Sequence, residues 1–478
     1  MKIDHKKMYL NGELVESSTG KSYKVICPGD ESIVATIAWA NKEDTERALE
    51  SAQAGFKIWS VLSVDKRVEW MEKLRCKIIE NGDRLRTSIM YELGKTWQGT
   101  EEDLTSITDS LRYYGEVINH RKDIPIEDRD GTHIHYLRSQ PLGVVVAFLA
   151  YNFPLLNLGF KLGPALAAGC SIILKPSEYS PLSAYIIGEL CADIDFPPGV
   201  INILCGDLKD VGIPLSESKI PKLITMIGST GTAQKLIAQG SMTSIKRYSM
   251  ECGGNAPFIV FSDADMDKAV SIGAALKLGN TGQICVAPNR FYIHENIIDT
   301  YVRRLTEKFE KASIGFGKEE NPDMGPLANK PAVDKMKLLV KESLEQGGSV
   351  IYGGTVIDRA GYYFTPTIIQ FDDNNAKVFQ EEIFGPIAFI APFSSKEEVI
   401  ELANDTTGGL ASYVFSKDEE TLRFFADKLE FGEIQLNGVK YDIYLPHGGI
   451  KDSGIGVDCS EYALDDYLVR KRVSQALA

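Results

Sequence analysis

From residue 142 onwards, short apolar segments alternate with segments of helical pattern, and this alternation limits the chain to few folds. The apolar segments LGVVVAFLA, CSIILKP and GVINILCG and the segment 223–228 are separated by helical patterns, among them 160–168 and 182–194. Strands that alternate with helices in this rhythm form right-handed βαβ units with a parallel sheet. The sequence therefore predicts an α/β fold whose ligands bind at the carboxyl ends of the strands.

A second alternation begins at PFIVF (257–261). The segments FYIHENI, SVIYGG, SYVFS and EIQLN read as strands, and helices are expected at 298–312, 395–404 and 420–428. We therefore expect a second α/β unit, and Cys285 belongs to it.

The remaining segments flank these two units. Short strands are expected between residues 8 and 38, followed by helices that Asn41 or Asp44 can cap and that break near Gly82 and Gly94. THIHYLRSQP alternates polar and apolar residues and reads as an extended strand that leaves the body. The tail 463–478 is expected to add another edge strand. The apolar region 143–160 is interrupted by polar residues, which favours a buried strand and a loop over a membrane span.

Composition narrows the class of protein. The 478 residues suffice for more than one core, and the net charge of -14 argues against binding to a phosphate backbone. The start of the chain has no apolar signal region. Its eight cysteines are scattered without a CxxC pair, which argues against a zinc site or a disulfide framework and favours a reducing cytoplasm.

Cys285 differs from the other cysteines in its surroundings. It lies in GNTGQICVAPNR (279–290), where glycines at Gly279 and Gly282 flank polar side chains. A thiol in such a loop can be reached by a small molecule and held as the thiolate that attacks carbon. A lone cysteine is also commonly a small buried hydrophobe. This stretch alone leaves catalysis and structural burial at even odds.

Polar stretches follow three strands of the first predicted unit. Asn152 could donate a hydrogen bond to a developing oxyanion, although an asparagine in a turn is the more common case. Lys175 and Glu178 could hold a nucleotide ribose, with Glu178 repelling a 2′-phosphate, or form a solvated turn. Residues 228–233 join a strand to a helix whose backbone amides favour phosphate, but their glycine spacing is not GxGxxG.

Three later stretches are also candidates. Glu251 beside two glycines could act as a general base if burial raises its pKa, or could simply end a strand. Glu382 and Phe384 beside a Gly-Pro turn could clamp a ribose and a planar ring, although alone they form an ordinary turn. His447 lies in the glycine-rich PHGGIKDSGIG, where packing or substrate contact is the more common role of a histidine than that of a base.

Taken together and in this order, with Cys285 after Glu251, these stretches resemble the aldehyde dehydrogenase superfamily (NAD(P)-dependent, non-acylating type) from about residue 8 to the end of the chain. The resemblance implies that Cys285 is the nucleophile, Asn152 the oxyanion donor and Glu251 the general base. The cofactor-binding residues that it implies are Tyr151, Lys175, Ser177, Glu178, Gly228, Ser229, Glu382 and Phe384. The substrate-binding residues are expected to be Phe153, Asn157, Phe160, Ile284, Tyr441 and His447, and no metal is expected.

The same resemblance implies a fold and a reaction. A Rossmann-like cofactor domain (1–119 and 142–252), an α/β catalytic domain (253–460) and a small β oligomerisation element (120–141 and 461–478) are expected, in a homodimer or homotetramer. An aldehyde would be oxidised to an acid by NAD+, with NADP possible, through a thiohemiacetal and a thioester on Cys285. Water activated by Glu251 would hydrolyse the thioester.

Departures from the family pattern bear on the substrate. Tyr151 stands where tryptophan is usual, and Ala233 replaces a common glycine of the phosphate loop. Phe160 stands where members acting on succinate semialdehyde often carry arginine. The positions expected to line the pocket are mixed in character: Asn157, Lys440, Tyr441, Tyr444 and His447. We therefore expect a small polar aldehyde, hydroxylated or anionic, such as lactaldehyde, sulfolactaldehyde or a semialdehyde, recognised by Lys440 or His447.

The sequence leaves several other functions open. A CoA-acylating dehydrogenase would keep Cys285 but typically lacks the general base, so Glu251 argues against it. A non-catalytic relative would be expected to lose Cys285 or the cofactor residues. A cofactor-free cysteine hydrolase has no need for Lys175 and Glu178. NAD is preferred to NADP on the evidence of Glu178 alone.

Overall fold

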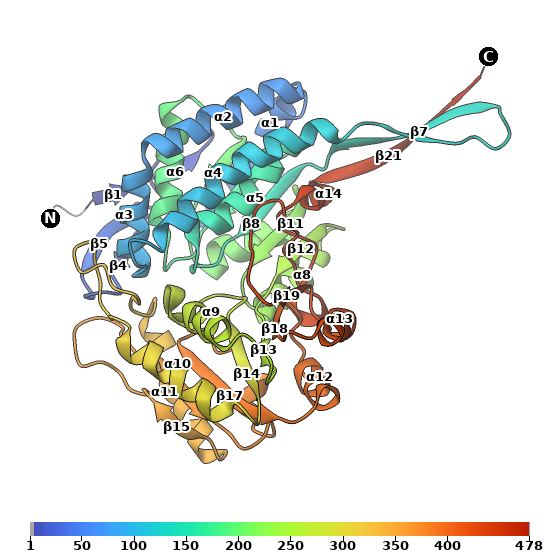
Figure 1. Cartoon of the computed structure of the whole chain (residues 1–478). Coiled ribbons are helices and arrows are strands. Elements are labelled where there is room, and N and C mark those ends of the chain that lie inside the picture. The colour runs from blue at the N-terminus through green and yellow to red at the C-terminus, as the bar shows by residue number, and fades with distance from the viewer. Residues whose placement is uncertain (1–3, 478) are drawn as a thin grey trace.

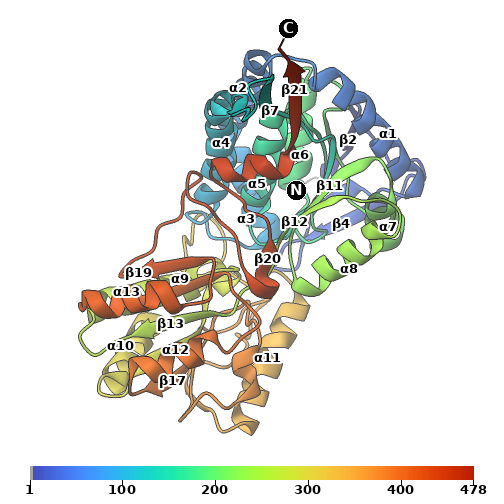
Figure 2. The same cartoon turned by 90° about the vertical axis from the view of Figure 1, so that its right-hand side faces the viewer.

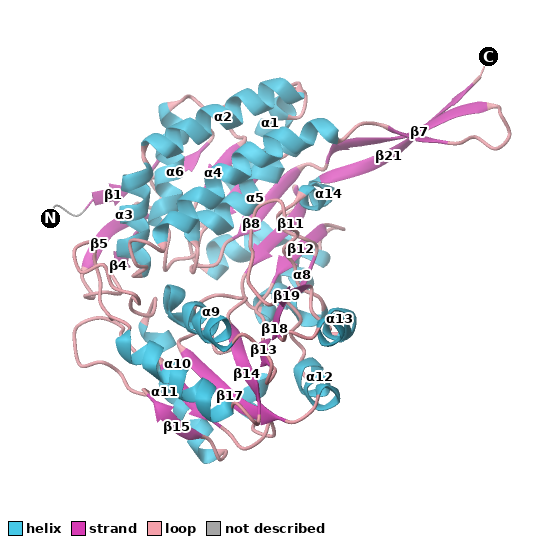
Figure 3. Ribbon diagram, viewed as in Figure 1, coloured by secondary structure: helices cyan, strands magenta, loops and turns pink. Residues whose placement is uncertain are grey.

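Two sheets form the framework of the chain, one for each of the two predicted alternations (Figure 1). The computed structural model describes residues 4–477. The two α/β units stack on one another, and a β arm extends from the first unit (Figures 1 and 2). Figure 3 shows both sheets covered by helices.

The first sheet has eight strands within the described residues. Their spatial order is β20 (Gly454–Ile455), β12 (Arg247–Glu251), β11 (Pro221–Ile227), β8 (Val144–Phe148), β9 (Ser171–Lys175), β10 (Ile201–Ile203), β2 (Met8–Leu10) and β3 (Glu13–Val15). The strands from β12 to β10 are parallel, and the edge strands run antiparallel to their neighbours. The chain runs outward from β8 to β10 and then returns to the other side of β8. This reversal places a ligand crevice at the carboxyl ends of β8 and β11.

The helices of the first unit follow the sequence pattern closely. They are α1 (Lys42–Trp59), α2 (Val64–Glu80), α3 (Gly82–Leu93), α4 (Thr100–Val117), α5 (Pro154–Ala168), α6 (Leu182–Asp193), α7 (Ile213–Glu217) and α8 (Thr230–Ser241). Asn41 and Asp44, the two predicted caps of α1, form a capping box together. The predicted breaks at Gly82 and Gly94 separate α2, α3 and α4. Side chains of α1 to α6 pack with the sheet strands into one apolar core.

Helix α5 begins earlier than the sequence indicated. The pattern predicted a loop up to residue 160, whereas the helix starts at Pro154, which suits the first turn because proline has no N–H to satisfy. The Asp103 carboxylate of α4 accepts hydrogen bonds from the backbone N–H groups of Leu155 and Leu156 at 3.1 and 3.2 Å. The cap of α5 therefore comes from a residue 51 positions before its start, which a local pattern does not reveal.

Strand β12 was not expected from the sequence. The segment RYSME has no apolar run, but it pairs in parallel with β11 and antiparallel with β20. Glu251 therefore ends a strand of the sheet, as one of its two interpretations from the sequence allowed.

The second sheet has seven strands within residues 4–477. Their order is β15 (Ser349–Tyr352), β16 (Thr367–Gln370), β17 (Ile387–Phe393), β14 (Pro288–His294), β13 (Ala256–Val260), β18 (Ala411–Phe415) and β19 (Glu433–Leu436). The helices around it are α9 (Met266–Leu278), α10 (Ile298–Lys311), α11 (Lys330–Glu345), α12 (Lys396–Asn404) and α13 (Glu419–Lys428). In β13, Phe258 and Val260 pack with α9 and α10, while Ile259 packs with α11 and α13. Because successive side chains of a strand point to opposite faces, helices cover both sides of this sheet.

The predicted extended strand and the predicted tail strand pair with each other. β21 (Leu468–Ala476) runs antiparallel to β7 (His133–Pro141), and β6 (Ile124–Ile126) adds a third strand. Figure 1 shows β7 and β21 projecting away from the body, and α14 (Leu464–Tyr467) leads into β21. A further small sheet joins β1 (Asp4–Lys6), β5 (Ile33–Ala38) and β4 (Ser22–Ile26).

None of the helices between residues 4 and 477 is both long and apolar enough to span a membrane.

Candidate active site

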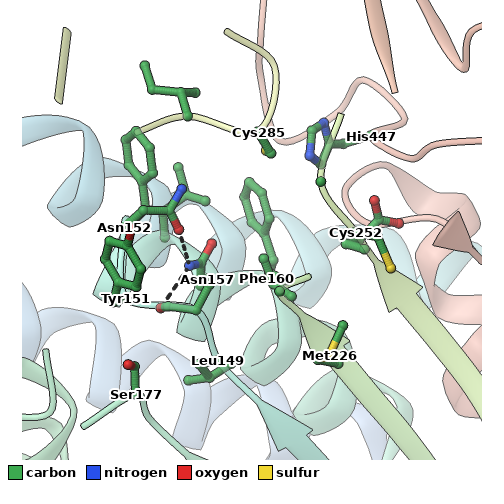
Figure 4. A pocket seen from close by; sticks show the side chains of 18 of the residues that line it. Leu149, Tyr151, Asn152, Asn157, Phe160, Ser177, Met226, Cys252, Cys285 and His447 are labelled. Carbon is green, nitrogen blue, oxygen red and sulfur yellow. Dashed lines mark hydrogen bonds between the residues drawn. The ribbon is translucent and has the colours of Figure 1, made fainter. Parts of the chain in front are cut away.

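A cavity of about 1430 Å³ lies between the carboxyl ends of the first sheet and the second unit. Every residue that the sequence analysis assigned to catalysis, cofactor or substrate lines it. Figure 4 shows part of this cavity, with Asn152, Asn157 and Phe160 from the first unit facing Cys285 and His447 from the second. Tyr444, which the sequence analysis also expected in the lining, is exposed and lies outside it.

The loop that carries Cys285 has an unusual backbone. It begins with the short 3₁₀ turn η3 (Gly279–Gly282), in which Asn280, Thr281 and Gly282 have positive φ angles of 45°, 58° and 69°. The Thr281 hydroxyl anchors the loop by donating to the carbonyl of Gly325 at 2.9 Å. Positive φ angles at residues other than glycine store backbone strain that the surrounding structure must balance. The Cys285 thiol is half-buried in the cavity, whereas the neighbouring Cys252 is buried.

Hydrogen bonds tie Asn152 to the Cys285 loop. The Asn152 amide donates to the carbonyl of Gln283 at 3.0 Å, and the Asn280 amide donates to the Asn152 carbonyl at 2.9 Å. Asn157 on α5 donates to the Asn152 side-chain oxygen at 3.3 Å and thereby orients the amide (Figure 4). The Asn152 side-chain N–H groups therefore point towards the segment that carries the nucleophile.

Glu251 lies at the end of β12 with a side chain that has no hydrogen-bond partner. It is 3% exposed, and neither carboxylate oxygen is paired within the described residues. Burial and then the nearby charge of Asp458 raise the pKa of Glu251 well above its usual value, against the opposing effect of His447 and Lys161. Asp458 is itself bound by the Lys161 ammonium, which is 2.7 Å from both carboxylate oxygens. The buried site therefore favours the protonated, neutral form of Glu251.

The predicted ribose and phosphate residues lie together at one end of the cavity. Lys175 ends β9, and Ser177 and Glu178 follow it with half-buried side chains. Gly228 and Ser229 follow β11, and the Ser229 hydroxyl caps α8 by accepting from the Thr232 N–H at 3.3 Å. The backbone amides of the first turn of α8 are thus directed at this end of the cavity, where they suit an anion.

Glu382, Phe384 and Tyr151 lie further along the cavity. Glu382 accepts a hydrogen bond from the Gly254 N–H at 3.3 Å, and burial raises the pKa of Glu382 to about 7. The rings of Tyr151 and Phe384 are perpendicular, with centroids 5.8 Å apart. Phe384 has a positive φ of 53°, so its ring position depends on a strained backbone.

At the Cys285 end, the wall combines rings with polar groups. Phe153, Phe160 and Ile284 supply apolar surface, and the Tyr441 hydroxyl lies 3.0 Å from that of Tyr413. The His447 ring lies 6.1 Å from the Phe160 ring. Its Nδ1 is 2.6 Å from a carboxylate oxygen of Glu433.

Sequence reasoning missed several residues of this site. Glu433 at the start of β19, Lys335 on α11 and Met226 on β11 all line the cavity. Lys335 donates to the backbone carbonyl of Glu382 at 2.6 Å and so fixes that loop. Only Glu433 had a sequence signal, a glutamate directly after Gly432 in a segment otherwise interpreted as a strand.

The residues present fit a dinucleotide. A single cavity runs from Glu178 past the α8 N-terminus and Glu382 to Cys285, so one extended ligand can contact all of them. Within residues 4–477, no group of three or more His, Cys, Asp or Glu side chains is placed to hold a metal ion.

Comparison with known proteins agrees with this geometry. The sequence model of the aldehyde dehydrogenase family matches residues 14–473. D-glyceraldehyde dehydrogenase (NADP(+)) of Thermoplasma acidophilum is 35% identical over 98% of this chain and 95% of its own length. Succinate-semialdehyde dehydrogenase [NADP(+)] of Escherichia coli is 33% identical over 96% of this chain and 95% of its own.

Solved structures are also similar to this chain. Betaine aldehyde dehydrogenase from Staphylococcus aureus in complex with NAD+ superposes with a TM-score of 0.95 at 30% identity, covering 98% of this chain and 95% of that one. Family members therefore bind both NAD and NADP. The chain belongs to the aldehyde dehydrogenase family and is an NAD(P)-dependent oxidoreductase that acts on aldehydes.

Proposed function

We propose that this protein oxidises a small hydroxylated aldehyde to its carboxylic acid through a thioester on Cys285. The observation that carries the proposal is the convergence of Cys285, Asn152 and Glu251 on one cavity that also contains the cofactor residues. A CoA-acylating reaction needs no general base, and the presence of Glu251 in this cavity favours hydrolysis.

In the proposed reaction, the Cys285 thiolate attacks the aldehyde carbon to form a thiohemiacetal. The Asn152 amide and the Cys285 backbone N–H would stabilise the oxyanion, each such donor being worth about 3 kcal/mol. The bound nicotinamide cofactor supplies the hydride acceptor. Once the hydride has left, Cys285 carries a thioester. Glu251, after losing its proton, would activate the water that hydrolyses this thioester and would release the Cys285 sulfur.

The cofactor residues have distinct proposed roles. Lys175, Ser177 and Glu178 would contact the adenosine ribose, and Gly228 and Ser229 the pyrophosphate. Tyr151, Glu382 and Phe384, which line the same cavity, would contact the nicotinamide and its ribose.

The charge of the substrate end favours hydroxyl groups over an anionic substrate. The two basic side chains that line this end are each paired with a carboxylate, His447 with Glu433 at 2.6 Å and Lys440 with Asp442 at 3.0 Å. Phe160 adds apolar surface here. Hydroxyl groups can donate and accept beside Asn157, Tyr441 and these pairs, whereas a substrate carboxylate would meet no unpaired cation among the described lining residues of this end. The Thermoplasma relative, which is named for D-glyceraldehyde, supports this class.

A semialdehyde is the second candidate substrate. The Escherichia coli relative is named for succinate semialdehyde, and Pseudomonas aeruginosa has a glutarate-semialdehyde dehydrogenase 34% identical to this chain. An anionic substrate would require Lys440 to leave Asp442.

The test is NADH formation with NAD+ and a matched aldehyde panel, run without and with CoA. Lactaldehyde, glyceraldehyde and glycolaldehyde represent hydroxylated substrates, succinate semialdehyde and sulfolactaldehyde anionic ones, and propanal and hexanal apolar ones. We expect the highest kcat/KM for the hydroxylated group, no need for CoA, and no turnover by Cys285→Ala. Highest kcat/KM for a semialdehyde would assign the second candidate, and highest kcat/KM for hexanal would refute both.

We further propose how the chain is divided and assembled. Residues 1–119 and 142–252 would bind the cofactor, residues 253–460 would supply the nucleophile, and residues 120–141 with 461–478 would join subunits into a homodimer or homotetramer. The projecting arm of β7 and β21 supports its proposed role in joining subunits. Unpaired edge strands promote aggregation unless another chain or element covers them. A cytoplasmic location is supported by the state of the eight cysteines, which are all free.

A further inference from the structure

His447 and Glu433 form a pair on the wall opposite Asn152. The 2.6 Å contact between His447 Nδ1 and Glu433 Oε1 joins the loop after residue 446 to the start of β19. The two side chains are 16% and 9% exposed, so water screens their interaction only weakly. The second oxygen of Glu433 has no partner within the described residues. Glu433 therefore directs its charge at the imidazole and fixes the orientation of that ring.

The other side of the His447 ring faces the nucleophile. Figure 4 shows the Cys285 side chain and the His447 ring next to each other across the cavity. Burial opposes a charge on His447, but the Cys285 thiol and the Glu433 carboxylate together raise the pKa of His447 well above its usual value. Because Nδ1 is taken by Glu433, Nε2 is the ring nitrogen free to exchange a proton with sulfur.

Glu251 is a poor acceptor for that proton. No described group donates to the oxygens of its buried carboxyl, and burial raises the pKa of Glu251, so the protonated form is favoured. The Asn152 amide is a donor and cannot take a proton. His447 is therefore the basic group best placed beside Cys285.

We propose that His447, oriented by Glu433, takes the proton of the Cys285 thiol and keeps the nucleophile as a thiolate paired with an imidazolium. The S–H bond breaks and its electron pair stays on sulfur, while Nε2 gains the proton. When the thiolate later attacks an aldehyde, a C–S bond forms and the carbonyl π pair moves to oxygen. The imidazolium remains beside the reacting carbon, where it can donate to a substrate oxygen. The proposal rests on the role of Cys285 as nucleophile and adds a catalytic residue to it.

Other ionisable groups around Cys285 and His447 come from several segments. Glu433 comes from β19, Tyr441 from the loop before His447, and Tyr413 from β18, whose hydroxyl donates to the Val286 carbonyl at 2.7 Å. Glu251 on β12 has a pKa that burial raises, which favours its neutral form, and Asp458, which pairs with His447 through the backbone, is bound by the Lys161 ammonium. Glu433 is therefore the described carboxylate that acts directly on His447.

The pH dependence of thiol alkylation tests the proposal without substrate or cofactor. The whole protein is treated with iodoacetamide across a pH series, and the Cys285 peptide is quantified by mass spectrometry to separate it from the exposed Cys76. In the parent protein the alkylation rate of Cys285 should change less than about twofold between roughly pH 6.5 and 8.5. In His447→Phe it should rise about tenfold per pH unit up to about pH 8.5, the range of an ordinary thiol.

Matched variants distinguish proton transfer to His447 from a role of this residue in packing. Glu433→Gln keeps the shape of the pair but removes its charge, so the alkylation profile should shift part of the way towards that of His447→Phe. His294→Phe removes a histidine that packs on Phe393 and does not line the cavity, and it should keep the parent profile. If His447→Phe does not fold, the thiolate absorbance of the parent protein minus that of Cys285→Ser serves instead. That difference should persist down to about pH 6.5.

The proposal fails if Cys285 of the parent protein titrates like an ordinary thiol, or if His447→Phe and the parent share one alkylation profile. Either result would leave the proposed substrate class untouched, because no aldehyde takes part in the measurement. If His447→Phe loses turnover but keeps the parent alkylation profile, the proposed proton transfer is also refuted, and His447 would act in substrate binding alone.

Discussion

At the scale of single residues, the protonation state of Glu251 has consequences for the reaction. Glu251→Gln should still give one equivalent of NADH in a rapid burst, because in the proposed reaction hydride transfer precedes the step that needs the base. Its steady-state rate should fall by about 10²–10⁴-fold. Stopped-flow NADH absorbance measures both phases. A variant with no burst at all would place Glu251 before hydride transfer.

The raised pKa of Glu251 also sets the sign of the pH dependence. The base acts only after ionisation, so deacylation in the parent protein should become faster as the pH rises through the raised pKa of Glu251. In Glu251→Gln the residual steady-state rate should lose this dependence. Single-turnover assays over a pH series can compare the two slopes.

The expected preference for NAD depends on Glu178. Its carboxylate would repel a 2′-phosphate, so Glu178→Gln should raise kcat/KM for NADP+ by roughly tenfold, equivalent to about 1.4 kcal/mol. The same change should lower kcat/KM for NAD+, since the amide accepts less strongly from ribose hydroxyls. Steady-state kinetics with each cofactor give both values. Equal effects on the two cofactors would show that Glu178 does not discriminate between them.

At the scale of elements, the turn before Cys285 offers a matched pair of glycines. Gly282 has φ +69°, and an added Cβ would lie 2.2 Å from the backbone oxygen of Gly385. Gly279 has an ordinary φ of -55°, and an added Cβ would only touch Ile284 at 3.8 Å. Gly282→Ala should therefore destabilise the fold by about 1–3 kcal/mol and lower kcat, whereas Gly279→Ala should change both little. Chemical denaturation and NADH assays check the two variants, and similar losses in both would contradict the strain argument.

Glu92 links α3 to the start of α6 and makes stability depend on pH. Its buried carboxylate accepts hydrogen bonds from the backbone N–H groups of Leu182 and Ser183, and burial raises its pKa to about 8. Because the folded pKa exceeds the unfolded one, its contribution to stability is complete below about pH 4.5 and is lost as the pH rises through about 8.

Glu92→Gln should remove this contribution to the pH dependence. Between about pH 5 and 8 the Tm of the variant should fall less steeply than that of the parent protein. Glu50→Gln, at an exposed position of α1, should keep the parent slope. Thermal melts at several pH values compare the three proteins, and a parent slope in Glu92→Gln would rule out this residue as the cause.

At the scale of the whole molecule, the arm of β6, β7 and β21 is the feature that points to assembly. Its strands pair only with one another, and Ile124 and Ile134 are 50% and 53% exposed. Exposed apolar side chains on a projecting sheet are typical of surfaces that bind a partner.

The double variant Ile124→Lys with Ile134→Lys should therefore lower the molecular mass in solution towards that of a single chain. Ile351→Lys, an exposed isoleucine of β15 in the second sheet, should keep the parent mass. Light scattering after size exclusion measures all three. A mass that drops only in Ile351→Lys would move the subunit contact to the second sheet.

Local sequence patterns predicted much of the fold. The two alternations predicted both sheets, and Gly82 and Gly94 predicted helix ends, because apolar periodicity and backbone preferences act between near neighbours in sequence. Many cavity residues were predicted too. The carboxyl ends of predicted parallel strands placed Asn152 and Lys175 at one edge of the sheet, whereas Glu251 was predicted from its motif.

Tertiary contacts alone decided where α5 starts and that β12 forms. The start of α5 depends on Asp103 of another helix, and β12 forms because β11 and β20 flank it. The amino-acid sequence by itself identified much of the cavity lining through motifs along the chain, but it did not identify Glu433, Lys335 or Met226. The protonation of Glu251 and the pairing of His447 with Glu433 were decided by burial and by contacts between distant segments, because pKa values depend on surroundings that only the folded chain creates.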